Sequence, residues 1–265
     1  EIAQCLVGSE MCIRDSLLAS LPRPMGVEAN FGVIDAYGDG AYFETNNHSF
    51  NRINLEDAKD GIIVRTNYSH TGRPEEGFGF NREAVACHLV EPYAKKGEVT
   101  PELFTETLSR SFWHDLIQKD YSQGPDRWVV DQDFIPRFTT TATIVIEGCK
   151  PIAKEQKITP KEVEDQYIMW TGIGYAPCSE IVAVRCSQDG VDSRLRGTLP
   201  NGHCELGDKA QARKSEVFPL KKGNGEKYID MRKLFNDEGT GYVQQLVPLN
   251  LATYKREKAK RDSKE

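Results

Sequence analysis

Residues 30–46 read NFGVIDAYGDGAYFETN and contain the clearest folding signal in the sequence. Positions 31–36 alternate between the two faces of an extended chain, as expected for a half-buried strand. The Gly-Asp-Gly run at 38–40 supplies residue types that tolerate the positive φ angles of a tight turn. The chain then returns through positions 41–45, so the stretch predicts a β-hairpin.

Helical patterns follow the hairpin, and further strand patterns lie on both sides of them. An apolar stripe at four-residue spacing predicts a helix over residues 81–95. A Thr-Pro-Glu start at 100–102 predicts a second helix that continues to Leu116. The other predicted elements are strands over 49–55, 61–67, 137–148, 167–172 and 180–186, a capped turn at 159–162, and short helices over 210–217 and 228–236. Strands, then two helices, then strands predict a layered α+β domain.

The composition excludes several classes of protein. The 265 residues are 38% hydrophobic and 28% charged, which is enough apolar material for one large domain or two small ones. No apolar stretch reaches the ~18 residues that a membrane span requires. The net charge of −6 argues against a general nucleic-acid binder. Residues 255–265 are highly charged without an apolar stripe, and we expect them to form a solvated or frayed tail.

The first residues, EIAQCLVGSEMCIRDS at 1–16, show neither strand alternation nor a helical stripe. Their segment CLVGSEMCIRDS resembles the in-frame translation of a transposase-type sequencing-library adapter. A signal peptide is the alternative, but Glu10, Arg14 and Asp15 interrupt the apolar core that such a signal needs. We therefore expect a gene fragment open at its 5′ end, with a non-native segment, one partial domain over 17–254 and the charged tail.

Few residues form a recognisable chemical motif. The sequence contains no phosphate-binding loop, dinucleotide fingerprint, zinc-protease motif or nucleophile elbow. No two of the five His residues have helical ligand spacing, so no metal site is expected; a hydrolase with a metal ion on His48 and His70 is the alternative. Cys178 could be a nucleophile, but no nearby base is identifiable, and a free thiol in a loop is the favoured interpretation. Beyond the first segment the Cys residues form no CxxC pair, which predicts free thiols at Cys87, Cys149, Cys178, Cys186 and Cys204.

Two positions are better candidates for a reaction site. Asn67 ends a predicted strand and enters a loop, where its amide N–H can point at a developing oxyanion. It could equally start that loop as an Asx turn. Arg137 opens the strongest predicted strand, where it can bind a carboxylate or neutralise developing charge. The alternative for Arg137 is an ion pair with a neighbouring acid such as Asp131 or Asp133.

Four runs of residues resemble a known family. In order and spacing they resemble the acyl-CoA:6-aminopenicillanate acyltransferase branch of the N-terminal-nucleophile hydrolases, and they are similar, more distantly, to the choloylglycine (bile salt) and penicillin V hydrolases. The resemblance covers residues 17–247. The four runs are NFGVIDAYGDGAYFETNNHSF at 30–50, IVRTNYSHTG at 63–72, IPRFTTTATIVIEGCKP at 135–151 and MWTGIGYAPCSEIVAV at 169–184.

The resemblance implies an αββα sandwich, incomplete here because the N-terminal part is missing. It implies catalysis through a thioester on an N-terminal Cys whose own α-amino group is the base; Cys5 and Cys12 lie in the first segment and are not that Cys. Asn67 matches the family's oxyanion-hole Asn, and Arg137 matches its active-site Arg. Arg82, in FNREAVA, matches an Arg that begins a helix and is expected to bind substrate, although helix packing and pairing with acids explain it equally well.

We therefore expect a fragment of a cysteine amidohydrolase or acyltransferase that acts on the C–N amide bond of a small molecule. The fragment itself is expected to be inactive, because the nucleophilic Cys is absent from it. No cofactor is implied, since the Cys and its amino group suffice. The alternative is a non-catalytic binding or structural protein that keeps the sandwich. Secreted and cytoplasmic locations, and any oligomeric state, are compatible with both.

Overall fold

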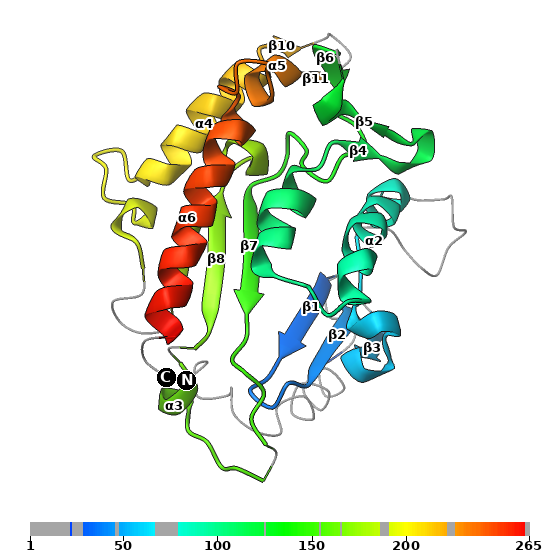
Figure 1. Ribbon diagram of the computed structural model, residues 1–265, viewed down its shortest axis with the longest axis vertical. Coiled ribbons are helices and arrows are strands. Elements are labelled where there is room, and N and C mark those ends of the chain that lie inside the picture. Colours follow the sequence, from blue (N-terminus) through cyan, green and yellow to red (C-terminus); the bar gives the residue numbers. More distant parts are fainter. Residues whose placement is uncertain are drawn as a thin grey trace. The chain divides into compact units, whose positions relative to one another are not determined.

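The computed structural model describes residue 22 and residues 29–45, 48–66, 79–124, 126–153, 155–164, 166–185, 191–221 and 226–262. The chain divides into two compact units. The first unit comprises residues up to Ile63 together with Glu147–Ile168, and the second comprises Val64–Ile146 and Met169–Glu265. Both helices and small sheets occur among the described residues, which confirms the α+β class (Figure 1).

The first unit contains the β-meander that the sequence predicts. Its three strands pair antiparallel in chain order, and the side chains of Val33, Ala41 and Phe43 bury its apolar face. The strands are β1 (Ala29–Ile34), β2 (Gly40–Thr45) and β3 (Phe50–Asn54).

The turn between β1 and β2 explains why this hairpin can be read from sequence. The Asp35 carboxylate accepts the backbone N–H groups of Tyr37, at 2.9 Å, and Asp39, at 3.0 Å. Gly38 adopts a φ of 87°, which a residue with a side chain rarely adopts. Local residues therefore determine the turn before any long-range contact forms.

The strand predicted over residues 61–67 is wrong for its described part. Asp60 and Gly61 have φ angles of 57° and 68°, and they turn the chain at the end of two short 3-10 turns, η2 (Leu55–Asp57) and η3 (Lys59–Gly61). Residues 62–66 follow without strand structure. Asn67 lies outside the described residues.

The predicted helices over 81–95 and 210–217 are present, whereas those over 100–116 and 228–236 need correction. The predicted helix over 81–95 is confirmed as α2, and the Thr159 capping box is confirmed because its N–H and hydroxyl both donate to the Glu162 carboxylate. The α-helices are α2 (Phe80–Ala94), α3 (Pro160–Val163), α4 (Glu205–Val217), α5 (Met231–Leu234) and α6 (Tyr242–Asp262).

The second predicted helix ends at Arg110 instead of Leu116. After residues 101 and 102 it continues as a π-helical turn, η4 (Leu103–Thr107), and a 3-10 turn, η5 (Leu108–Arg110). The Arg110 guanidinium donates back to the Thr105 carbonyl at 3.1 Å, and a short strand follows directly. The helix therefore ends at the buried Arg110, although the apolar sequence pattern continues to Leu116.

The described residues of the second unit form three small sheets. One has the strand order β7-β8-β9, one β10-β11-β6, and one is the pair β4-β5. The strands are β4 (Trp113–His114), β5 (Lys119–Asp120), β6 (Trp128–Val130), β7 (Ala142–Glu147), β8 (Ile168–Ile173), β9 (Val182–Arg185), β10 (Leu220–Lys221) and β11 (Lys227–Asp230). The strands predicted over 167–172 and 180–186 correspond to β8 and β9.

Two further predictions need correction in this unit. The strand predicted from Arg137 begins only at Ala142, because residues 137–141 form a turn. The helix predicted over 228–236 is strand β11 followed by the single turn α5. Tyr228 and Ile229 pair with Val130 and Val129 of β6, so a partner far away in the sequence decides their conformation.

Helix α6 packs against the sheet and extends through the segment that we expected to be a solvated tail. Trp170 of β8 and Tyr254 of α6 have ring centroids 4.2 Å apart, and α6 lies alongside β8 (Figure 1). Further along the helix, Glu257 is buried and pairs with Arg185 of β9 at 3.5 Å. Residues 255–262 are therefore helical and not frayed, although most of their side chains are exposed. Among the described residues, none of the helices combines the length and apolarity of a membrane span.

Candidate functional site

Two of the three predicted site residues, Arg82 and Arg137, lie within electrostatic range of each other. Arg82 is buried in the first turn of α2, and Arg137 is half-buried in the turn before β7. Burial lowers the pKa of Arg82 below its ordinary value, and the nearby charge of Arg137 lowers it further. Asp133 opposes both effects. Two cationic side chains are therefore held close enough to repel each other.

The start of α2 determines where Arg82 lies. Gly79 precedes the helix with a φ of 114°, and its carbonyl accepts the Thr66 hydroxyl at 3.1 Å. Beside Arg82, the buried Asn81 amide donates to the Asp133 carbonyl at 3.2 Å, and its oxygen accepts the Leu116 N–H at 3.1 Å. Asn81 thus fixes the helix start against the loop that leads to Arg137.

That loop is held by its own polar side chains, which is why it does not extend β7. The Arg137 N–H donates to the Thr140 hydroxyl at 3.0 Å, and the Thr140 N–H donates to the Arg137 carbonyl at 2.8 Å. The Phe138 N–H donates to the Asp131 carboxylate at 2.7 Å. Asp133 adopts a φ of 59°, in the left-handed region. These bonds occupy backbone groups that a strand would offer to a neighbour.

Asp131 and Tyr175 add two unsatisfied polar atoms to the same region. Asp131 Oδ1 and the Tyr175 hydroxyl are both buried without a hydrogen-bond partner. Burial raises the pKa of Asp131, although the Phe138 N–H and the charge of Arg137 favour its ionised form. Burial also raises the pKa of Tyr175 well above its ordinary value, and the Asp131 charge adds to that shift. Tyr175 is therefore a neutral hydroxyl in the interior of the second unit.

These contacts bear on the alternative that Arg137 only forms an ion pair with Asp131 or Asp133. Arg137 acts on Asp131 through its charge, and no ion pair within 4.0 Å joins Arg137 to Asp131 or Asp133 among the described residues. Asp131 therefore acts on the charge of Arg137 only from a distance. Arg82 is a buried helix residue, as its packing alternative requires, and the charge of Arg137 acts on it, which is compatible with a substrate-binding role.

The sequence analysis missed three residues that lie near Arg82, Arg137 or Asp131. Asn81 could have been noticed as a polar residue on the buried face of α2. Tyr175 and Lys214 carried no sequence signal, because distant segments bring them close to Asp131. Lys214 Nζ lies 4.1 Å from the centroid of the Phe138 ring, which adds a third cation beside this loop.

Two of the described thiols, Cys87 and Cys178, have raised pKa values. Burial raises the pKa of Cys178 to about 12, against the opposing charges of Arg213 and Arg110. Burial and the charges of Glu91 and Glu83 raise the pKa of Cys87. Both shifts disfavour the thiolate that nucleophilic catalysis needs.

The remaining predictions for this site concern metal binding and Asn67. Among the residues that the structure describes, no group of three or more His, Cys, Asp or Glu side chains could hold a metal ion. The proposed pair of His48 and His70 is not tested, because His70, like Asn67, lies outside the described part. No family model, curated protein or solved structure matches this chain.

Proposed function

We propose that this chain carries the charge-stabilising side of the active site of a cysteine N-terminal-nucleophile amidohydrolase or acyltransferase. Asn67 would supply an oxyanion-hole amide, Arg137 would stabilise developing negative charge, and Arg82 would bind the substrate. The proposal includes the αββα sandwich and a small-molecule amide substrate, both of which rest on the sequence resemblance. No cofactor enters the reaction.

The observation that carries the proposal is the pairing of Arg82 with Arg137. The charge of Arg137 disfavours the charged form of Arg82, and a negative charge bound or developing beside both groups would relieve that repulsion. A tetrahedral intermediate of amide cleavage bears a negative oxygen, and a preorganised positive site stabilises it more than the neutral amide. Asn81 and Thr140 support that preorganisation through the bonds described above.

The nucleophile in this proposal is a Cys that begins a processed chain, with its α-amino group as base. We assign no described thiol to this role, since the pKa values of Cys87 and Cys178 are both raised. The proposal therefore expects this chain alone to leave penicillin V, conjugated bile salts and N-acyl amino acids uncleaved.

Steady-state hydrolysis of those three substrates tests the proposal in two proteins: this chain, and the product of the complete open reading frame from which it comes. We expect background rates from the former and turnover from the latter. In the active protein, Arg137→Gln should lower kcat/KM by about 100-fold, as loss of one charge-stabilising donor does. The control is Arg232→Gln on α5, an exposed arginine, which should leave kcat/KM within about twofold.

Two results would contradict the proposal. One is an Arg137→Gln variant of the active protein that turns over as fast as the unmodified protein. The other is turnover by this chain that Cys178→Ala removes, because the nucleophile would then be a thiol that we exclude.

A non-catalytic binding protein is the second candidate, and the raised pKa values of Cys87 and Cys178 are compatible with it because they disfavour the thiolates. In that case the arginine pair would bind an anionic group without reaction. The complete open reading frame would then yield no turnover of any of the three amides, whereas phenoxyacetate would bind and Arg137→Gln would weaken its binding.

A further inference from the structure

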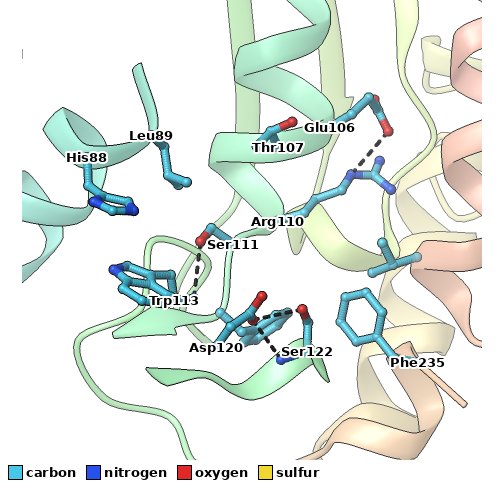
Figure 2. A pocket seen from close by; sticks show the side chains of 12 residues that line it. His88, Leu89, Glu106, Thr107, Arg110, Ser111, Trp113, Asp120, Ser122 and Phe235 are labelled. Atoms are coloured by element: carbon cyan, nitrogen blue, oxygen red, sulfur yellow. Dashed lines mark hydrogen bonds and ion pairs between the residues drawn. The ribbon is translucent and has the colours of Figure 1, made fainter. Parts of the chain in front are cut away.

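The second unit contains a pocket of about 260 Å³ whose lining residues are separate from the Arg82–Arg137 cluster. Figure 2 shows the side chains around it, which come from α2, η4, η5, the pair β4-β5 and the residues that follow α5. An engineered apolar cavity of about 150 Å³ holds benzene, so this volume is sufficient for one ring with a short substituent. Thr107 and His88 line the pocket and are exposed, so it is open to solvent.

Strands β4 and β5 place a carboxylate beside an indole in this pocket. Trp113 and Asp120 are partners in the antiparallel register of the two strands, and both line the pocket. Directly opposite residues of an antiparallel pair project from the same face, with Cβ atoms about 5 Å apart. The backbone register therefore makes the carboxylate and the aromatic ring neighbours.

The Asp120 carboxylate is fixed through one oxygen and can bind a further partner through the other. Oδ1 accepts the Ser122 N–H at 2.9 Å and the Ser122 hydroxyl at 2.7 Å. Within the described part of the chain, Oδ2 has no hydrogen-bond partner and Asp120 forms no ion pair. The side chain is half-buried, and Oδ2 is not among the enclosed unpartnered atoms, so a ligand can reach it. Figure 2 shows the carboxylate between Trp113 on one side and Phe235 on the other.

Asp120 is the charge that the pocket presents to a ligand. Arg110 also lines the pocket, but its side chain is only 1% exposed and its Nε lies 3.6 Å from the Glu106 carboxylate, so these two charges offset each other. Lys119, the neighbour of Asp120 in the sequence, pairs with Asp126 at 2.5 Å. Among the described residues, the accessible charge of the pocket is therefore negative, and it attracts a cation.

The remaining walls favour an organic cation with an attached ring. Phe112, Phe235 and Val243 supply an apolar surface, and the two Phe rings meet edge to face at 6.0 Å between centroids. The Trp113 indole, on which His88 stacks with centroids 5.1 Å apart, adds a further aromatic wall. Aromatic rings attract ammonium groups, and the apolar surface removes the attached hydrocarbon from water.

We propose that this pocket binds a small organic ammonium ion, for which benzylammonium is a suitable probe. The ammonium group donates to Asp120 Oδ2 beside the Trp113 indole, and the attached ring packs against Phe112 and Phe235. This inference requires no nucleophile and does not depend on the proposed amidase function.

Calorimetric titration of the full 265-residue chain at low salt tests the proposal with benzylammonium, benzyl alcohol and benzoate. Benzyl alcohol has nearly the same shape without the charge, and benzoate has the opposite charge. We expect a benzylammonium Kd below about 1 mM and affinities at least about tenfold weaker for the other two compounds. A parallel NMR titration with benzylammonium should move the indole N–H signal of Trp113, identified by its loss in Trp113→Phe, and leave that of the buried Trp170 unchanged.

One variant and its control locate the binding. Asp120→Asn removes the charge and keeps an oxygen that can accept the Ser122 N–H, so the turn after β5 stays capped. It should weaken benzylammonium at least about tenfold. Asp237→Asn is the matched control, because it removes the same charge from an exposed residue that does not line the pocket, and it should change the Kd by less than about twofold.

Four results would each overturn the proposal. They are absence of benzylammonium binding, equal or tighter binding of benzyl alcohol, an unmoved Trp113 signal, and an Asp120→Asn variant that binds benzylammonium no more weakly than Asp237→Asn does. The first three are measured on the unmodified binding site, so they decide the matter even where Asp120→Asn does not fold.

Discussion

The side-chain amide of Asn250 on α6 donates to both carboxylate oxygens of Glu106, at 3.1 and 3.2 Å, across a separation of 144 residues. The oxygen of the same amide accepts the Ile181 N–H at 3.0 Å. Because Glu106 also pairs with Arg110, one buried amide connects α6 to the ion pair and to the segment before β9. The side chains of Asn250, Glu106 and Arg110 thus form one buried polar network.

Replacing Asn250 should therefore be costly. Asn250→Ala leaves the Ile181 N–H and part of the Glu106 carboxylate without partners, and we expect a loss of about 2–4 kcal/mol in the free energy of unfolding. Urea denaturation measures it. Gln245→Ala, an exposed amide on the same helix, should cost less than about 1 kcal/mol. Equal losses in the two variants would show that the network does not stabilise the fold.

Glu106 should give the stability a defined pH dependence. Burial raises the pKa of Glu106, and it outweighs the opposing effects of Arg110, Asn250 and Thr105. The folded chain then binds a proton more tightly than the unfolded chain, so this group stabilises the fold below its ordinary pKa. That contribution is lost as the pH rises through the raised value.

Urea denaturation across this pH range measures the effect in the unmodified chain and in Glu106→Gln. The difference in stability, unmodified minus variant, should become less favourable to the unmodified chain as the pH rises. A difference that is constant, or that increases with pH, would contradict the raised pKa.

Repulsion between Arg82 and Arg137 should appear in a double-mutant cycle. With Arg82→Gln and Arg137→Gln, the coupling energy between the two positions should be unfavourable in the unmodified chain, by about 0.5–1 kcal/mol. Added salt should reduce it, because screening weakens the repulsion. A favourable or zero coupling at low salt would remove the observation on which the proposed function rests.

Cys178 should resist alkylation while the chain is folded. Burial raises its pKa to about 12, so very little thiolate is present at pH 8. Mass spectrometry after iodoacetamide treatment should find Cys178 unmodified in the folded chain and modified in urea, whereas the half-buried Cys204 reacts first. Rapid labelling of Cys178 in the folded chain would show that its pKa is not raised.

The sequence predicts those parts of the fold that local residues determine. The hairpin could be predicted because Asp35 and Gly38 specify its turn, and the capped turn because Thr159 and Glu162 are three residues apart. Strand β11 could not be predicted, because its conformation depends on pairing with β6. The charged end of α6 looked like a solvated tail, since only the tertiary structure brings Arg185 to Glu257.

The candidate site was likewise predictable only where local sequence determines it. Arg82 and Arg137 could be selected from motifs, but their adjacency follows from a loop whose geometry depends on Asn81 and Asp131. Arg137 was expected on a strand because β-branched residues follow it. Side-chain bonds to the loop backbone, such as that of Thr140, override this preference and hold Arg137 in a turn instead.

The contact between Trp170 and Tyr254 has an optical consequence. Trp170 is fully buried, so its emission should lie at shorter wavelength than that of the partly exposed Trp128, and Tyr254 is close enough to transfer its excitation energy to the indole. Separation of α6 from β8 would abolish the transfer and shift the emission to longer wavelength. The chain thus contains an intrinsic fluorescent reporter of α6 docking, which can follow folding without an attached label.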